Sequence, residues 1–174
     1  LLCINAQSMF DFLAENFNSF KNKPLVFCSK GIDTKYCLFQ TEIAERFLDK
    51  KLFSVLSGPG FASDIVREKP IALSLACKNV NLGKKLQHML SSQSIRIYLN
   101  NDLIGTQLGG ALKNVIAIAC GIADANELGE GAKSAIITRG FSEIRQIGKT
   151  FGCKIETLFG LSCLGDLTLT CNSK

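Results

Sequence analysis

Several residue types are scarce in this sequence, and each shortage excludes a class of protein. There is one histidine, His88, and the eight cysteines show no Cys-x-x-Cys spacing, so neither a zinc site nor a disulfide framework is predicted. No uninterrupted apolar run reaches about 18 residues, which argues against a membrane span. The basic residues are scattered although the formal net charge is +5. This distribution argues against nucleic acid as a partner and weakly favours small anionic ligands.

What the sequence does contain is typical of a globular protein with a sizeable core, because 47% of its 174 residues are hydrophobic and 20% are charged. Several of the cysteines fall in apolar runs, and the cysteines are interpreted as small core residues of a reduced, cytoplasmic protein. His88 has polar neighbours and is predicted to lie on the surface. The chain opens at Leu1 inside an apolar segment, without a targeting sequence, and we expect it to be an interior fragment.

Strands and helices alternate over the first hundred residues. The patterns predict strands at 1–5, 25–28, 53–56, 71–76 and 95–99, and helices at 8–20, 41–50, 63–68 and 82–90. This alternation predicts an α/β fold with a partial doubly wound, Rossmann-like parallel sheet. Beyond residue 101 the patterns become helical, with predicted helices at 102–125, 132–151 and 155–158. We therefore place a domain boundary near residue 100, followed by an all-α domain over 101–174.

The apolar stretch 105–123 carries a single amine, that of Lys113. At helical spacing Lys113 shares a face with Gly109 and Gly110. Each glycine costs about 1 kcal/mol relative to alanine, so close packing against another backbone or a ligand must offset them. Burial lowers the pKa of such an amine and suits it to proton transfer, with Asn114 as a second hydrogen-bonding group. The alternative is a lysine whose stem lies on the core while its head reaches solvent.

Two loops follow predicted strands, at residues 29–31 and 57–60. Ligands of open α/β sheets bind beyond the carboxyl ends of the strands, where glycines let backbone N–H groups approach an anion. Lys30 supplies a charge for a phosphate, although each loop alone is also compatible with an ordinary turn. Asp166 is explained either as a helix N-cap or as a carboxylate that orients Lys113 or a substrate hydroxyl.

Four collinear motifs resemble the bacterial type of NAD(P)-dependent glycerol-3-phosphate dehydrogenase. They are Leu56-Ser57-Gly58-Pro59, the segment from Gly109 to Val115, Ile137-Thr138-Arg139-Gly140, and Gly160-Leu161 with Gly165-Asp166-Leu167. The resemblance covers essentially the whole chain. It implies an oxidoreductase that interconverts sn-glycerol 3-phosphate and dihydroxyacetone phosphate with NAD(H) or NADP(H), for glycerophospholipid synthesis, and it is compatible with a homodimer.

The resemblance also implies roles for individual residues. Lys113 is the proton donor and acceptor, and Asp166 binds substrate and supports that lysine. Residues 1–100 become the later part of a dinucleotide-binding domain whose first βαβ unit is missing, and 101–174 the first part of a helical substrate domain. The remaining contacts are to substrate from Lys30, Gly58 and Gly60, and to cofactor from Lys30 and Ala62, with no metal. Asn114 is expected to contact the substrate because it follows Lys113 on the helix.

The sequence departs from the family pattern at Gly60, where the family usually has serine or threonine, and at Asn5-Ala6-Gln7-Ser8, where a Pro-Ser segment is usual. The Gly-rich dinucleotide turn is not among these residues, so the fragment alone is expected to be inactive. Two alternatives remain open. One is another lysine-dependent dehydrogenase of the 6-phosphogluconate or ketopantoate type, and the other is an inactive remnant that serves as a helical packing or dimerisation module.

Overall fold

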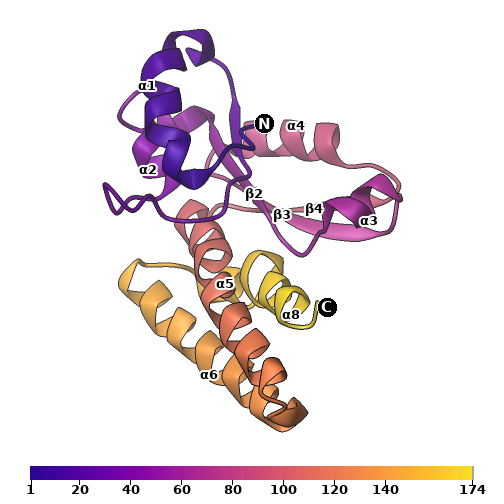
Figure 1. Cartoon of the computed structure of the whole chain (residues 1–174). Coiled ribbons are helices and arrows are strands. Elements are labelled where there is room, and N and C mark those ends of the chain that lie inside the picture. Colours follow the sequence, from indigo (N-terminus) through magenta and orange to yellow (C-terminus); the bar gives the residue numbers. More distant parts are fainter. Residues whose placement is uncertain (174) are drawn as a thin grey trace.

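The computed structural model describes residues 1–173, in which a sheet with flanking helices is followed by a group of helices (Figure 1). The strands are β1 (Leu25–Phe27), β2 (Phe53–Ser57), β3 (Ile71–Cys77) and β4 (Ile95–Asn100). The helices of the sheet part are α1 (Met9–Phe20), α2 (Gln40–Ala44), α3 (Ala62–Val66) and α4 (Val80–Leu90). The later helices are α5 (Leu103–Ala125), α6 (Gly129–Thr150), α7 (Ile155–Leu158) and α8 (Asp166–Cys171), with a π-helical turn, η3 (Leu161–Gly165), before α8.

The sheet has the order β1-β2-β3-β4, and both of its faces are covered. Side chains of alternate parity point to opposite faces of a strand. Phe27 and Phe53 join a core with α1 and α2, whereas Leu75 and Ile97 join a separate core with α4. The predicted α/β, doubly wound architecture followed by helices is therefore confirmed.

One feature of the predicted sheet is wrong. The pairs β1–β2 and β3–β4 are parallel, but β2 and β3 run antiparallel, with Ser57 opposite Ser74. The connection between them holds only α3, a helix of five residues without a buried side chain. A parallel crossover usually needs a helix that packs on the sheet and carries the chain back, and α3 does not do this. The chain therefore reverses direction.

Element ends also differ from the expectations in places. Of the strand predicted at 1–5, only Leu2 forms a bridge, parallel to β1 at Phe27. The helix predicted at 41–50 ends at Ala44, and α6 begins at Gly129, three positions before the predicted start at Ala132. The sheet part ends with β4 and the helical part begins with α5, while the division into two domains near residue 100 stays a prediction.

Helix α5 is the central element of the helical part. It packs against α6 and α8 and also reaches the sheet part, where Gln107 exchanges two hydrogen bonds with Thr41 of α2. By length and composition alone α5 could cross a membrane, since an 18-residue window has a mean hydropathy of 1.4 although it is interrupted by Lys113. Its buried face, including Leu108 and Cys120, belongs to the core of the helical part.

Candidate functional site

A buried carboxylate with two amines lies where the sheet part meets the helices. Asp166 Oδ1 accepts a hydrogen bond of 2.6 Å from Lys113 Nζ, and Asp166 Oδ2 accepts one of 2.5 Å from Lys30 Nζ. The Asp166 side chain is 2% exposed and that of Lys113 is 9% exposed, whereas Lys30 keeps 30% of its side chain in solvent. The three side chains come from α8, α5 and the loop after β1, so this contact exists only in the folded chain.

The alternative explanation of Asp166 as an N-cap is wrong. Asp166 has helical dihedral angles as the first residue of α8, and its side-chain oxygens accept hydrogen bonds from the amines of Lys30 and Lys113. The turn η3 continues directly into α8 and aims the carboxylate inward at α5. The carboxylate pairs with Lys113 and Lys30 instead, and its role in orienting Lys113 remains a proposal.

A second partner of Lys113, Thr170, was missed by the sequence reasoning. Thr170 Oγ1 donates to the backbone oxygen of Asp166 at 2.7 Å and accepts from Lys113 Nζ at 2.7 Å. The spacing of four residues between Asp166 and Thr170 on one helix was the available signal. An ammonium has three protons. Two are used on these partners, which leaves one for an oxygen of a bound ligand.

The paired glycines of α5 permit close contact on this side of the helix. A Cβ atom on Gly109 would lie 2.5 Å from Cys163 Cβ and 2.7 Å from the backbone oxygen of Ser162. A Cβ on Gly110 would lie 3.3 Å from Lys30 Cγ and 3.4 Å from Ser57 Oγ. The expectation of tight packing against another backbone is confirmed at Gly109. At Gly110 the neighbours are side chains of the site itself.

Burial lowers the pKa of Lys113 below its ordinary value of 10.5, because the charged amine loses hydration. The hydrogen bond and charge of Asp166 oppose this shift, and the nearby positive charge of Lys30 adds to it. The prediction of a recessed amine with a lowered pKa is thus confirmed. Such a group is suited to donate and recover a proton.

The glycines of the loop after β2 lie close to the site. Gly58 has φ of +149°, and a Cβ there would be 3.2 Å from the Leu73 backbone, so only glycine suits this turn. A Cβ on Gly60 would lie 3.4 Å from Leu73 Cδ2. Pro59 Cγ is 3.6 Å from the Cβ position of Gly165, the residue before Asp166. The loop therefore borders the carboxylate.

Two predicted contact residues are not brought to the charged groups. Asn114 is exposed and makes no side-chain hydrogen bond within the described part of the chain. Successive residues of a helix point about 100° apart, so Lys113 and Asn114 face different directions. Ala62 is exposed at the start of α3. Their assignment to substrate and cofactor remains a proposal.

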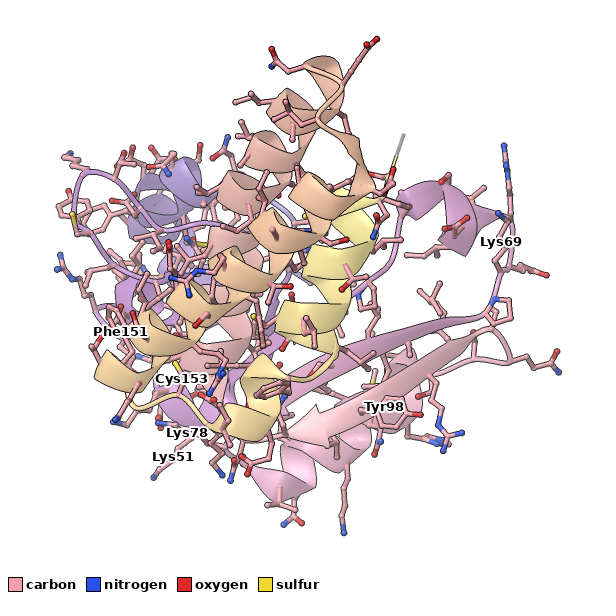
Figure 2. All side chains as sticks on the ribbon, turned by 90° about the horizontal axis from the view of Figure 1, so that it is seen from below. Lys51, Lys69, Lys78, Tyr98, Phe151 and Cys153 are labelled. Atoms are coloured by element: carbon pink, nitrogen blue, oxygen red, sulfur yellow. The ribbon has the colours of Figure 1, made fainter. Side chains whose placement is uncertain are left out.

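Cavities elsewhere are lined by other residues. One of about 620 Å³ lies between β3, β4 and α7 and includes Tyr98, which Figure 2 shows on β4. Another of about 470 Å³ lies at the corner of α6 and α7 beside Cys153. Residues 1–173 hold no cluster of histidine, cysteine or acidic residues that could bind a metal, and all eight cysteines are free.

The site has groups that suit the reacting end of a nicotinamide dinucleotide. Ser57 Oγ is a buried hydroxyl without a partner beside Lys30, so polar groups are available where a reacting ligand would meet Lys113. The turn that usually holds a pyrophosphate, Gly-x-Gly-x-x-Gly between a strand and a helix, does not occur in these 174 residues. The residues thus fit the reacting end of such a group, and they do not include the pyrophosphate turn.

A Rossmann-like half sheet is followed by helices that place a recessed lysine beside an aspartate next to the sheet, and this arrangement defines a two-part α/β fold. Comparisons with known proteins specify the family. Residues 1–83 match the model "NAD-dependent glycerol-3-phosphate dehydrogenase N-terminus" and residues 102–174 match the corresponding C-terminus model. The chain belongs to the NAD-dependent glycerol-3-phosphate dehydrogenase family.

Individual relatives agree with this assignment. A glycerol-3-phosphate dehydrogenase [NAD(P)+] from Roseobacter denitrificans is 44% identical over the whole chain, which covers 54% of that protein. One from Parvibaculum lavamentivorans is 44% identical over 88% of the chain and 46% of its own length. The crystal structure of glycerol-3-phosphate dehydrogenase from Coxiella burnetii superposes with a TM-score of 0.92 at 34% identity, over 98% of this chain and 53% of that one. The chain spans about half the length of the curated relatives it matches.

Proposed function

We propose that this chain contributes the proton-transfer site of an enzyme that interconverts dihydroxyacetone phosphate and sn-glycerol 3-phosphate. The observation that carries the proposal is the Lys113–Asp166 pair, with an N–O distance of 2.6 Å and nearly complete burial. Membership of the family supplies the substrate, since the relatives carry the name of that activity. The proposed reaction is reduction of a ketone to a secondary alcohol, or its reverse.

Lys113 has the central role in the proposed reaction. Reduction of the carbonyl carbon places negative charge on its oxygen, and the free proton of the Lys113 ammonium neutralises it. Asp166 and Thr170 hold the amine in place and favour its protonated form between turnovers. In the oxidation direction the neutral amine accepts the proton of the alcohol.

Lys30 is assigned to binding. Its amine is more exposed than that of Lys113 and lies on a loop, so it can exchange Asp166 for the phosphate of the substrate. The backbone of Gly58 and Gly60 lines the same edge and is proposed to contact the substrate, while Ala62 at α3 is proposed to contact the cofactor. When bound, NAD(P)H supplies the hydride.

A kinetic assay of the full-length protein tests the proposal. Addition of dihydroxyacetone phosphate should cause oxidation of NADH or NADPH with formation of an equal amount of glycerol 3-phosphate. Ketopantoate and ribulose 5-phosphate with carbon dioxide serve as competing substrates, because they represent the other lysine-dependent dehydrogenases. Reduction of one of these in place of dihydroxyacetone phosphate would overturn the proposal, and loss of all turnover would favour the inactive remnant.

We also propose a cytoplasmic location and a soluble enzyme that can form a homodimer. Eight free cysteines, four of them buried, are consistent with a reducing compartment. Fractionation of cells and light scattering on the purified protein test the location and the oligomeric state.

A further inference from the structure

The hydroxyl of Ser57 is the unusual polar group of the site. It is one of two buried side-chain atoms without a hydrogen-bond partner in the described residues, the other being Gln40 Oε1. Buried hydroxyls are nearly always paired, so an unpaired one next to a reaction site calls for an explanation. Ser57 is the last residue of β2, immediately before the Gly58-Pro59-Gly60 loop.

The surroundings of Ser57 place this hydroxyl against the charged groups. The Cβ position of Gly110 lies 3.4 Å from Ser57 Oγ and 3.3 Å from Lys30 Cγ, so the hydroxyl, the Lys30 stem and α5 meet there. Gly110 is one helical turn before Lys113. The hydroxyl is thus shielded from solvent in part by the stem of a lysine whose amine is held on Asp166.

The two lysines and Asp166 account for the ionic parts of a triose phosphate but not for its neutral end. A three-carbon substrate with its carbonyl at Lys113 and its phosphate at Lys30 has one group left, the C1 hydroxyl. A hydroxyl needs a partner that can both donate and accept, and serine provides both. A phosphate, by contrast, would need several donors, which a single hydroxyl between an aliphatic stem and a glycine does not offer.

We propose that Ser57 is a substrate-binding residue that recognises the C1 hydroxyl of the triose phosphate. In the free protein the Lys30 stem covers it. When the Lys30 amine leaves Asp166 for the substrate phosphate, the stem moves and the Ser57 hydroxyl gains the substrate hydroxyl as its partner. This inference rests on the proposed function, since it assigns the third polar group of the same substrate.

The same strand provides a matched control. Ser54 is also fully buried, but its Oγ donates to the backbone oxygen of Leu25 at 3.0 Å, and by strand alternation it points to the opposite face of β2. Ser54→Ala therefore removes a paired hydroxyl away from the site. Ser57→Ala removes an unpaired hydroxyl at the site, so it should leave the melting temperature of the free protein unchanged or raised.

The test compares dihydroxyacetone phosphate with hydroxyacetone phosphate, which lacks the C1 hydroxyl, in the full-length protein. We expect Ser57→Ala to lower kcat/KM for dihydroxyacetone phosphate about 3- to 10-fold, as for one neutral hydrogen bond, and to leave that for hydroxyacetone phosphate unchanged. Ser57→Cys, with a weaker donor of similar size, should show the same pattern. Ser54→Ala should lower the melting temperature and leave the preference between the two substrates unchanged.

The possible failures are distinguishable. If the parent protein does not reduce dihydroxyacetone phosphate, the proposed function fails. If the parent is active but Ser57→Ala lowers kcat/KM equally for both substrates or for neither, Ser57 does not contact the C1 hydroxyl and the inference is overturned.

Discussion

The two lysines that pair with Asp166 lie on different structural elements, Lys113 on a helix and Lys30 on a loop. This difference suits them to two different roles, proton transfer and anion binding. Lys113 projects from the long helix α5 and is held by two acceptors on α8 with 9% of its side chain exposed. Lys30 follows the three-residue strand β1, has one acceptor and keeps 30% of its side chain in solvent. A fixed, desolvated amine suits proton transfer, whereas a half-exposed amine on a loop suits capture of an anion.

The largest effect on the rate is expected from substitution of Lys113, the lysine on the helix. Lys113→Met in the full-length protein should lower kcat by about 10²–10⁴-fold, the usual loss for a general acid, while cofactor binding stays near normal. Steady-state rates and a fluorescence titration with NADH measure the two halves. Lys133→Met is the control, because Lys133 is also a largely buried helical lysine paired with an aspartate, 2.8 Å from Asp124, away from the site. A normal rate in Lys113→Met would remove this lysine from the mechanism.

The pKa of Lys113 should appear in the pH dependence of both directions. Reduction needs the charged amine, so its rate should fall up to tenfold per pH unit as the pH rises through this pKa, which burial places below 10.5. Oxidation needs the neutral amine and should become faster over the same range. Rates measured in both directions from neutral to alkaline pH check this, and parallel profiles for the two directions would contradict it.

Substitution of Lys30, the lysine on the loop, is expected to have a smaller effect, and on KM more than on kcat. Lys30→Ala should raise KM for dihydroxyacetone phosphate about 10- to 100-fold, as for a lost charge-assisted hydrogen bond, with less change in kcat. Added inorganic phosphate should inhibit this variant less than the parent. Lys69→Ala is the control, since Lys69 is an exposed lysine that pairs with Asp64 of α3 and makes no contact with Asp166. Unchanged KM in Lys30→Ala would make Lys30 an ordinary solvated residue.

Substitution of Thr170 should give the smallest effect, and it tests whether Lys113 is held more firmly than Lys30. Thr170→Val removes one of the two acceptors of Lys113 and should lower kcat about 3- to 10-fold, the value of one hydrogen bond, with little change in KM. Thr168→Val changes an exposed threonine of the same helix whose hydroxyl donates to Leu164, and it should leave kcat unchanged. Equal behaviour of the two variants would show that Thr170 does not position the amine.

The position of Lys113 could be predicted from the sequence better than that of Lys30. Two adjacent glycines and one amine in an apolar helix give a local signal, because their spacing along the helix fixes which of them share a face. Spacing along α8 relates Thr170 to Asp166 only, whereas the contact of Thr170 with Lys113 and the ion pair of Lys30 with Asp166 join segments far apart in the chain, so no local pattern encodes these two contacts. The family resemblance indicated Asp166, but only the fold joins it to both lysines.

The direction of β3 was missed for a related reason. Its residues read as a strand, and periodicity carries no information about whether that strand runs parallel or antiparallel to its neighbour. The length and exposure of the connecting helix α3 decide the direction. The position of Asn114 away from the charged groups has a simpler reason, since adjacency in sequence on a helix means separation around its axis.

The reversal between β2 and β3 also places different loops at the two ends of the strands. The edge with Lys30 and the Gly58 loop is called the ligand edge, and the opposite edge is free for attachment of a label. Because β3 and β4 run opposite to β1 and β2, the turn after β3 at Lys78 opens on the edge away from Lys30 and the Gly58 loop. Lys78 and Lys51 lie together on that edge in Figure 2, distant from Lys69. A fluorophore or surface linker attached at position 78 would thus immobilise or report on the protein while leaving the ligand edge open to solvent.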